Sequence, residues 1–151
     1  MKKFLVFIVL CLVIGVSANA KAPKSKSPKA KTYKVEKTFE VYIDNSKVET
    51  GATLTGNSVV EIKANGYLMF VDNTGKKRYY LNRSCKSKVK DLIAQVKKPK
   101  SVAKSFLEEM MSMRERSAYS SAGNIERRPN IIHLNDLEVD ENGEIKVYMI
   151  E

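Results

Sequence analysis

The chain contains very few of the side chains on which catalysis and metal binding usually depend. Its 151 residues include a single histidine, His133, and two cysteines, Cys11 and Cys85. One histidine and two cysteines, of which Cys11 lies in an N-terminal apolar run, are a poor set for a tetrahedral zinc site. The glycines are scattered as single turn residues, which gives no phosphate-binding loop. We therefore expect no metal and no cofactor.

Cysteine is also too scarce for a disulfide framework. If the N-terminal apolar run is removed on export, Cys85 is the one remaining cysteine. The core then has to be held by apolar burial alone. Cys85 is a candidate reactive thiol, and we expect it either to be buried as a small hydrophobic residue or to pair with another chain. Together with His133 it leaves a cysteine hydrolase as an alternative.

The N-terminus has the pattern of a secretory signal peptide over residues 1–20. Lys2 and Lys3 precede an unbroken apolar run over residues 4–14, and residues 18–20 are Ala-Asn-Ala. This order of basic, apolar and small residues predicts cleavage after Ala20. The run is shorter than the ~20 residues that a membrane-spanning helix needs. We expect export to the periplasm or the extracellular space, with no transmembrane segment after cleavage.

The rest of the chain is long enough for one small domain with flanking segments. Residues 21–32, rich in Lys, Ala, Pro and Ser, predict a flexible basic linker. An α+β domain is expected over residues 33–113, followed by a loop or disordered segment over residues 114–130. Residues 131–151 are acidic and carry short strand signals, which predict strands or a C-terminal hairpin.

The predicted core is an antiparallel meander over residues 58–81. A strand from Tyr33 to Asp44, with apolar residues at alternate positions, comes before it. Asn65-Gly66 predicts a hairpin turn, because both residues tolerate φ > 0. Residues 72–75, Asp-Asn-Thr-Gly, predict a second hairpin. The strand between the two turns is apolar on both sides, so the sheet needs cover on each face.

Two amphipathic helices are predicted to supply that cover. The first has Ser87 as its cap and the apolar face Val89, Leu92, Ile93 and Val96. The second has Ser101 as its cap and the apolar stripe Val102, Phe106, Leu107, Met110 and Met111. Methionines at this spacing favour a core role over an adaptable partner groove. The expected fold class is α+β, a small antiparallel sheet covered by two helices.

Basic residues dominate the charge, which is +10 for the whole chain and +8 after loss of Lys2 and Lys3. The tail from residue 136 onward is acidic instead, which allows either an internal electrostatic clasp or two separate partner surfaces. Tyr79 and Tyr80 beside a basic residue keep extracellular nucleic acid or another polyanion as an alternative ligand. The candidate contacts for an anionic surface or a partner are Lys76, Lys77, Arg78, Arg83, Lys86, Lys88 and Lys90.

One run of turn and core residues has a recognisable order. A glycine-led turn with a leucine precedes a Val/Ile strand, and the next strand ends on Asp with a glycine after it. The residues concerned are Gly51, Leu54, Val60, Ile62, Asn65, Gly66, Leu68, Phe70, Asp72 and Gly75. This order, within residues 35–81, resembles the FecR-like periplasmic domain, a small β module of bacterial envelope proteins. The resemblance implies a β-sheet interaction module.

These observations predict a secreted, non-enzymatic interaction module of the bacterial envelope. It is expected to bind a protein partner or an anionic envelope component rather than nucleic acid. The alternatives are a hydrolase that uses Cys85 and His133, and an extracellular nucleic-acid or polyanion binder. The sequence does not identify a small-molecule ligand.

Overall fold

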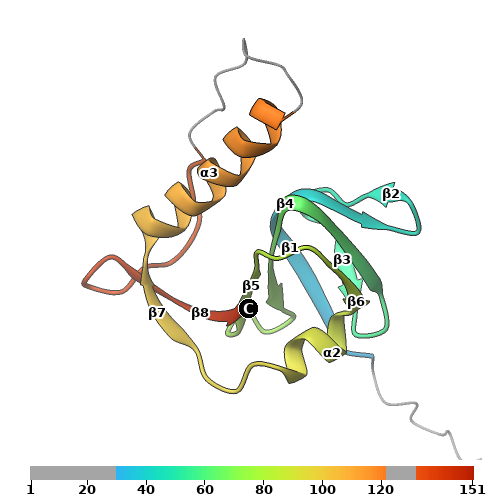
Figure 1. Cartoon of the computed structure of the whole chain (residues 1–151). Coiled ribbons are helices and arrows are strands. Elements are labelled where there is room, and N and C mark those ends of the chain that lie inside the picture. The colour runs from blue at the N-terminus through green and yellow to red at the C-terminus, as the bar shows by residue number, and fades with distance from the viewer. Residues whose placement is uncertain (1–29, 122–131) are drawn as a thin grey trace, which may run out of the picture.

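The computed structural model describes residues 30–121 and 132–151. These residues form one eight-stranded mixed sheet and two helices, so the architecture is α+β as predicted (Figure 1). The predicted signal peptide and most of the predicted linker lie outside the described residues. The elements are β1 (Thr32–Ile43), β2 (Ser46–Lys47), β3 (Thr53–Thr55), β4 (Val59–Asp72), β5 (Arg78–Leu81), β6 (Cys85–Lys88), α2 (Val89–Ala94), β7 (Lys100–Ala103), α3 (Lys104–Ser121) and β8 (Glu144–Ile150).

The sheet is connected differently from the predicted antiparallel meander. Its order is β2-β1-β4-β5-β8-β7, with β3 also paired to β1 and β6 also paired to β4. β5 and β8 are parallel, with Arg78 beside Val147 and Leu81 beside Ile150. β8 therefore lies inside the sheet, between β5 and β7, and does not form a C-terminal hairpin. Alternation identified β8 as a strand but carried no information about its partner.

The predicted hairpin turn at Asn65-Gly66 is wrong, because both residues lie within the single strand β4. Asn65 does adopt the left-handed conformation, with φ of 63°, but it bends the strand instead of reversing it. Opposite the bend, β1 has the single residue Glu40, with φ of 50°, where β4 has the four residues 63–66. A Cβ on Gly66 would lie 2.8 Å from Ile62 Cγ2 and 2.9 Å from the Glu40 carbonyl oxygen. The two strands thus bend together around a position that only glycine fits.

The bend divides β4 into two halves with different partners. The first half pairs with β6, where Val59 lies beside Lys88. The second half pairs with β5, where Val71 lies beside Arg78. The second predicted turn is confirmed here, since β4 and β5 are antiparallel and Gly75 has φ of 73°. Two consecutive strands, β5 and β6, therefore lie beside opposite ends of β4.

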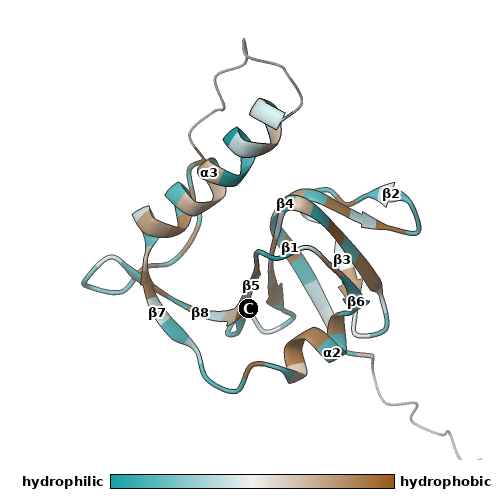
Figure 2. Ribbon diagram, in the orientation of Figure 1, coloured by the Kyte–Doolittle hydropathy of each residue, from teal (hydrophilic) through white to brown (hydrophobic). Residues whose placement is uncertain are grey.

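Each face of the sheet carries its own apolar core. Along β4, Leu68 and Phe70 belong to the first core, and the alternate residues Tyr67 and Met69 belong to the second. This alternation is the ordinary consequence of strand geometry. Figure 2 shows apolar residues concentrated on the central strands and on α2. The first core includes Val89 and Leu92 of α2, and the second includes Leu107 and Met111 of α3 with Leu134, Ile145 and Val147.

Helix α2 is shorter than predicted and is not capped by Ser87. Ser87 lies in β6, and the N-cap residue is Lys88, which makes no side-chain capping bond. The backbone N–H groups of its first turn are satisfied instead by the loop between β3 and β4, where the Ser58 carbonyl accepts from the Val89 N–H at 3.0 Å. The Lys90 N–H donates to the Gly56 carbonyl at 2.9 Å. A loop that is distant in sequence thus supplies the hydrogen-bond acceptors that a local capping side chain would otherwise provide.

Helix α3 begins later and ends later than predicted. Ser101 belongs to β7 and is not a cap, and the helix continues through the first part of the predicted loop as far as Ser121. Residues 122–130 of that loop lie outside the described residues. Two contacts to the bend of β4 hold this extension: the Tyr67 hydroxyl donates to Glu115 at 2.8 Å, and Arg114 donates to the Gly66 carbonyl at 3.1 Å. Tertiary contacts here override the absence of helical periodicity.

Neither helix within the described ranges combines the length and the hydropathy needed to cross a bilayer. Of the predicted C-terminal strand segments, residues 132–134 and 137–139 carry no strand, and only residues 144–150 do.

Candidate functional site

The seven basic residues predicted as contacts do not form one surface. Lys76, Lys77 and Arg78 follow the end of β4, in the turn to β5 and at the start of β5. Lys86 and Lys88 lie on β6, which pairs with the opposite end of β4, and Lys90 is in α2. The long bent strand therefore separates the set into two groups.

Arg78 is occupied by an interaction within the sheet. Its Nε and Nη2 donate to the two carboxylate oxygens of Glu36 at 2.6 and 3.0 Å. The side chains are only 15% and 18% exposed, so this two-bonded pair is largely shielded from solvent. Arg78 therefore links β5 to β1.

Two more of the predicted contacts also have partners within the chain. Arg83 Nη2 donates to Gln95 Oε1 at 2.6 Å. Lys86 lies 3.0 Å from Glu61 Oε2, and the same carboxylate is bound by Lys63. Hydrogen bonds from Lys63 and then Lys86 lower the pKa of Glu61, which keeps it charged. The basic partners are exposed and Glu61 is partly exposed, so the pairs contribute little to stability.

Lys88 and Lys90 have no ion pair among the described residues, and the backbone brings Lys31 beside them. The Gly56 N–H donates to the Lys31 carbonyl at 3.2 Å, and the Gly56 carbonyl accepts from the Lys90 N–H at 2.9 Å. One glycine thus bridges the start of β1 to the start of α2, which lie together in Figure 1. All three lysines are exposed. We call Lys31, Lys88 and Lys90 the basic end.

The basic end is also where the lysine-rich N-terminal segment joins the described chain. In the sequence, Ala30 and Lys31 directly follow a segment with lysines at positions 21, 24, 26 and 29. Sequence reasoning assigned that segment to a linker and did not connect it to the middle of the chain. Charge counting identifies both basic stretches, but their meeting depends on the pairing of β1 with β3, for which the sequence has no local signal.

The opposite end of β4 combines basic and acidic residues. A hollow of about 430 Å³ there is lined from one side by Lys76 and Arg78 and from the other by Glu138, Asp140 and Glu144. The acidic tail therefore faces the basic turn, as the clasp interpretation of the charge asymmetry requires. Partial compensation of charge at this end makes the basic end the more distinct cationic surface.

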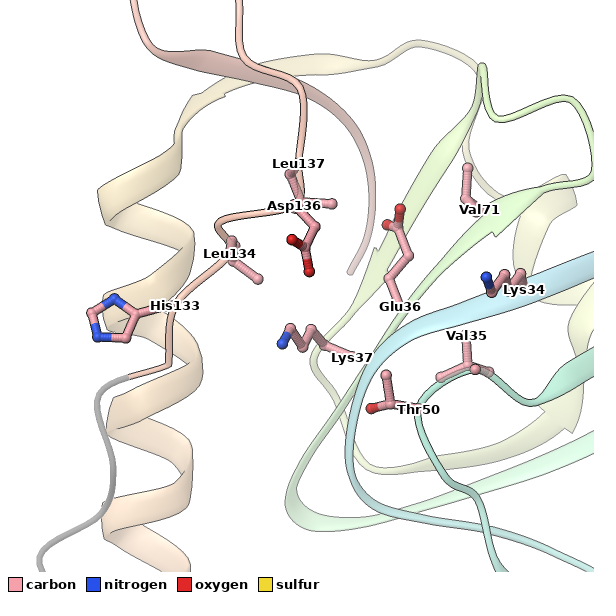
Figure 3. Close-up of a pocket in the computed structure, with 11 residues that line it drawn as sticks. Lys34, Val35, Glu36, Lys37, Thr50, Val71, His133, Leu134, Asp136 and Leu137 are labelled. Atoms are coloured by element: carbon pink, nitrogen blue, oxygen red, sulfur yellow. The ribbon is translucent and has the colours of Figure 1, made fainter.

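Cys85 and His133 occupy separate environments. Cys85 packs against the first core, and burial raises the pKa of its thiol, with Arg83 opposing the shift. His133 is exposed and lines a hollow beside β1, and in Figure 3 its ring points away from that hollow. The neighbouring Leu134 belongs to the second core. A raised thiol pKa disfavours the thiolate that a nucleophile requires, and no hydrogen bond links the two side chains in the described structure.

Within residues 30–121 and 132–151, no group of three or more His, Cys, Asp or Glu side chains is arranged to hold a metal ion. Comparison of the chain with protein families, with curated proteins and with solved structures found no match. The FecR-like resemblance therefore stays a prediction.

Proposed function

We propose that this chain is an exported, non-enzymatic binding module of the bacterial envelope, and that its basic end binds an anionic envelope surface. In this proposal α2 and α3 each cover one face of the sheet. Exposed side chains on the outside of the molecule bind the ligand. Export rests on the signal-peptide pattern of residues 1–20. The alternative, a protein partner in place of a lipid surface, is distinguished by the vesicle-binding experiment.

The meeting of Lys31, Lys88 and Lys90 carries the proposal. Backbone bonds of Gly56 join Lys31, just before β1, to Lys90 of α2, and Lys88 lies two residues before Lys90, so the three charges are gathered without a new ordering cost. A lysine close to an anionic membrane surface contributes about 1 kcal/mol of binding free energy. In the sequence, four more lysines, at positions 21, 24, 26 and 29, come before Ala30. Attraction of this kind is screened by salt, because the Debye length falls from about 10 Å at 0.1 M to about 3 Å at 1 M.

The test measures binding of residues 21–151 to vesicles with and without phosphatidylglycerol, at low and high salt. The informative variant is Lys88→Gln/Lys90→Gln. Its matched control, Lys76→Gln/Lys77→Gln, removes the same charge from the opposite end of β4. The first variant is expected to bind about 30-fold more weakly, on the basis of about 1 kcal/mol for each lysine. The control is expected to bind within about three-fold of the unmodified chain, because screening limits the reach of distant charges.

Three results would contradict the proposal. Equal losses in the two variants would mean that net charge alone governs binding. Binding that does not depend on salt would exclude the electrostatic mechanism. Retention of one defined envelope protein at high salt, without affinity for vesicles, would replace the lipid surface by a protein partner. A parallel titration with duplex DNA tests the polyanion alternative, which predicts comparable affinity for both anionic ligands.

A further inference from the structure

A hollow of about 440 Å³ lies between β1 and the segment after residue 132. One wall consists of residues 34–37 of β1 with Thr50 and Gly51, and the other consists of residues 133, 134, 136 and 137. Val71 of β4 contributes an apolar side chain to its lining. Its size is within the range of about 300–1,000 Å³ that is typical of small-molecule sites.

The first wall is shaped by a bulge in β1. Val35 pairs with Phe70 and Lys37 pairs with Met69, so Glu36 is an extra residue with no partner on β4. The carboxylate of Glu36 is held by Arg78 at 2.6 and 3.0 Å, which compensates its charge. The bulge thereby places a lysine at the hollow next to a carboxylate that is already paired.

The second wall is anchored to the core and to α3. Leu134 is 1% exposed, and its N–H donates to Glu108 of α3 at 2.7 Å. The Leu137 N–H donates back to the Leu134 carbonyl at 3.2 Å, which closes a turn around Asp136. Asp136 is therefore presented by a turn whose ends are fixed, and the site is largely preformed.

Opposite charges meet across this hollow without pairing. Figure 3 shows the Lys37 ammonium and the Asp136 carboxylate reaching into it from the two walls, with the Thr50 hydroxyl below them. Neither Lys37 nor Asp136 takes part in an ion pair within the described residues. The side chains of Val71, Leu134 and Leu137 supply an apolar lining beside these charges. A ligand that fits must offer an anionic group, a cationic group and a small apolar part.

We propose that this hollow binds a small zwitterion of the amino-acid or short-peptide type. The ligand carboxylate binds Lys37, the ligand ammonium binds Asp136, and the ligand side chain contacts Leu137. Each charged group thus receives an oppositely charged hydrogen-bonding partner, and such charge-assisted bonds are the strong ones. Lys34 at the same wall adds a second positive charge near the carboxylate position. The inference is independent of the proposed function, because its residues lie outside the basic end.

The test follows backbone amide resonances of ¹⁵N-labelled residues 21–151 during titration with leucine and glycyl-leucine. N-acetyl-leucine lacks the ammonium and leucinamide lacks the carboxylate, so each removes one half of the expected recognition. We expect shifts at Lys37, Thr50 and residues 134–137, a millimolar dissociation constant, and about ten-fold weaker binding of either blocked compound. Lys37→Met should abolish the preference for leucine over leucinamide, and Asp136→Asn should abolish the preference over N-acetyl-leucine.

Exposed control variants near the other end of β4, Lys88→Met and Asp91→Asn, should leave all four affinities unchanged. Equal binding of leucine and N-acetyl-leucine to the unmodified chain would identify a simple anion site and overturn the proposal. The absence of shifts at about 10 mM ligand would also overturn it. So would shifts that lie outside the hollow or that persist in both Lys37→Met and Asp136→Asn.

Discussion

Glu36 and Arg78 are joined by two hydrogen bonds across β4, the strand that separates them in the sheet. Glu36 is the bulged residue of β1, and Arg78 is the first residue of β5. Both side chains are less than one-fifth exposed, at 18% and 15%. The pair therefore fixes the local shape of β1 and, with it, the wall of the hollow that contains Lys37.

Removal of Arg78 should destabilise the fold by more than an exposed basic residue does. Arg78→Leu leaves the Glu36 carboxylate without its partner, and we expect a loss of about 1–3 kcal/mol in the free energy of unfolding. Lys77→Leu, one position earlier and exposed, should change it by no more than about 0.5 kcal/mol. Urea denaturation of both variants measures the difference. Equal values would show that the pair contributes nothing measurable.

Substitution of Gly66 should be far more damaging than substitution of Gly75. An added Cβ at Gly66 meets backbone carbonyl oxygens of Glu40 and Lys63 at 2.9 Å, whereas at Gly75 nothing lies within 4 Å. We expect Gly66→Ala to cost about 3 kcal/mol or more through steric conflict at the bend. Gly75→Ala should cost about 1 kcal/mol through its positive φ alone. Thermal unfolding followed by circular dichroism ranks the two variants, and the reverse ranking would refute the account of the bend.

Two buried tyrosines of the second core should respond oppositely to loss of the hydroxyl. The Tyr80 hydroxyl is buried with no hydrogen-bond partner among the residues that the structure describes, whereas the Tyr67 hydroxyl donates to Glu115 at 2.8 Å. Tyr80→Phe is expected to be neutral or to stabilise the fold by up to about 1 kcal/mol. Tyr67→Phe should destabilise it by about 1 kcal/mol. Denaturant titrations of the two variants test this, and a destabilising Tyr80→Phe would reveal an unrecognised partner for that hydroxyl.

Stability should fall at alkaline pH because of the buried tyrosines. Burial raises the pKa of Tyr80 to about 12, with Arg114 opposing, and burial also raises the pKa of Tyr79 to about 12. In the unfolded chain both groups ionise near pH 10. The folded state holds these protons longer, so their contribution is complete below about pH 10 and is lost as the pH rises toward 12. Tyr80→Phe should make the decline shallower, and ultraviolet titration of tyrosinate measures the ionisation directly.

The thiol of Cys85 should react slowly in the folded protein. Burial raises its pKa, so little thiolate is present near neutral pH. We expect a colorimetric thiol reagent to label Cys85 at pH 8 much more slowly than after denaturation. Rapid labelling that also depends on His133 would revive the hydrolase alternative. A dimer on non-reducing gels that Cys85→Ser abolishes would instead support pairing with another chain.

Sequence patterns predicted local conformation better than they predicted partners. The strand from Tyr33, the turn at Gly75 and the strand at residues 144–150 were all predicted correctly. At Asn65 the positive φ was predicted correctly, but the hairpin was not, because the same conformation serves a bend within a strand. Nothing near Asn65 encodes that β1 spans this region with the single residue Glu40 where β4 uses four, since β1 is distant in sequence.

The candidate sites show the same division between local and non-local information. Lys88 and Lys90 are candidate contacts from the sequence, but Lys31 falls in the predicted linker, and only the contacts of Gly56 join Lys31 to Lys90. Ser87 and Ser101 were given as caps because serine suits that role, although backbone pairing placed both in strands. Lys37 and Asp136 carry no sequence motif, and their meeting depends on a bulge and on an anchored turn.

The position of β8 between β5 and β7 governs when this protein can fold. β5 ends at Leu81 and β7 at Ala103, yet the strand that joins them begins only at Glu144. During synthesis, β7 and α3 leave the ribosome before the strand that carries Ile145 and Val147 of the second core. Such long-range pairing delays folding until most of the chain has been made. An order of assembly that keeps the nascent chain open until late would suit the export that we propose for this chain.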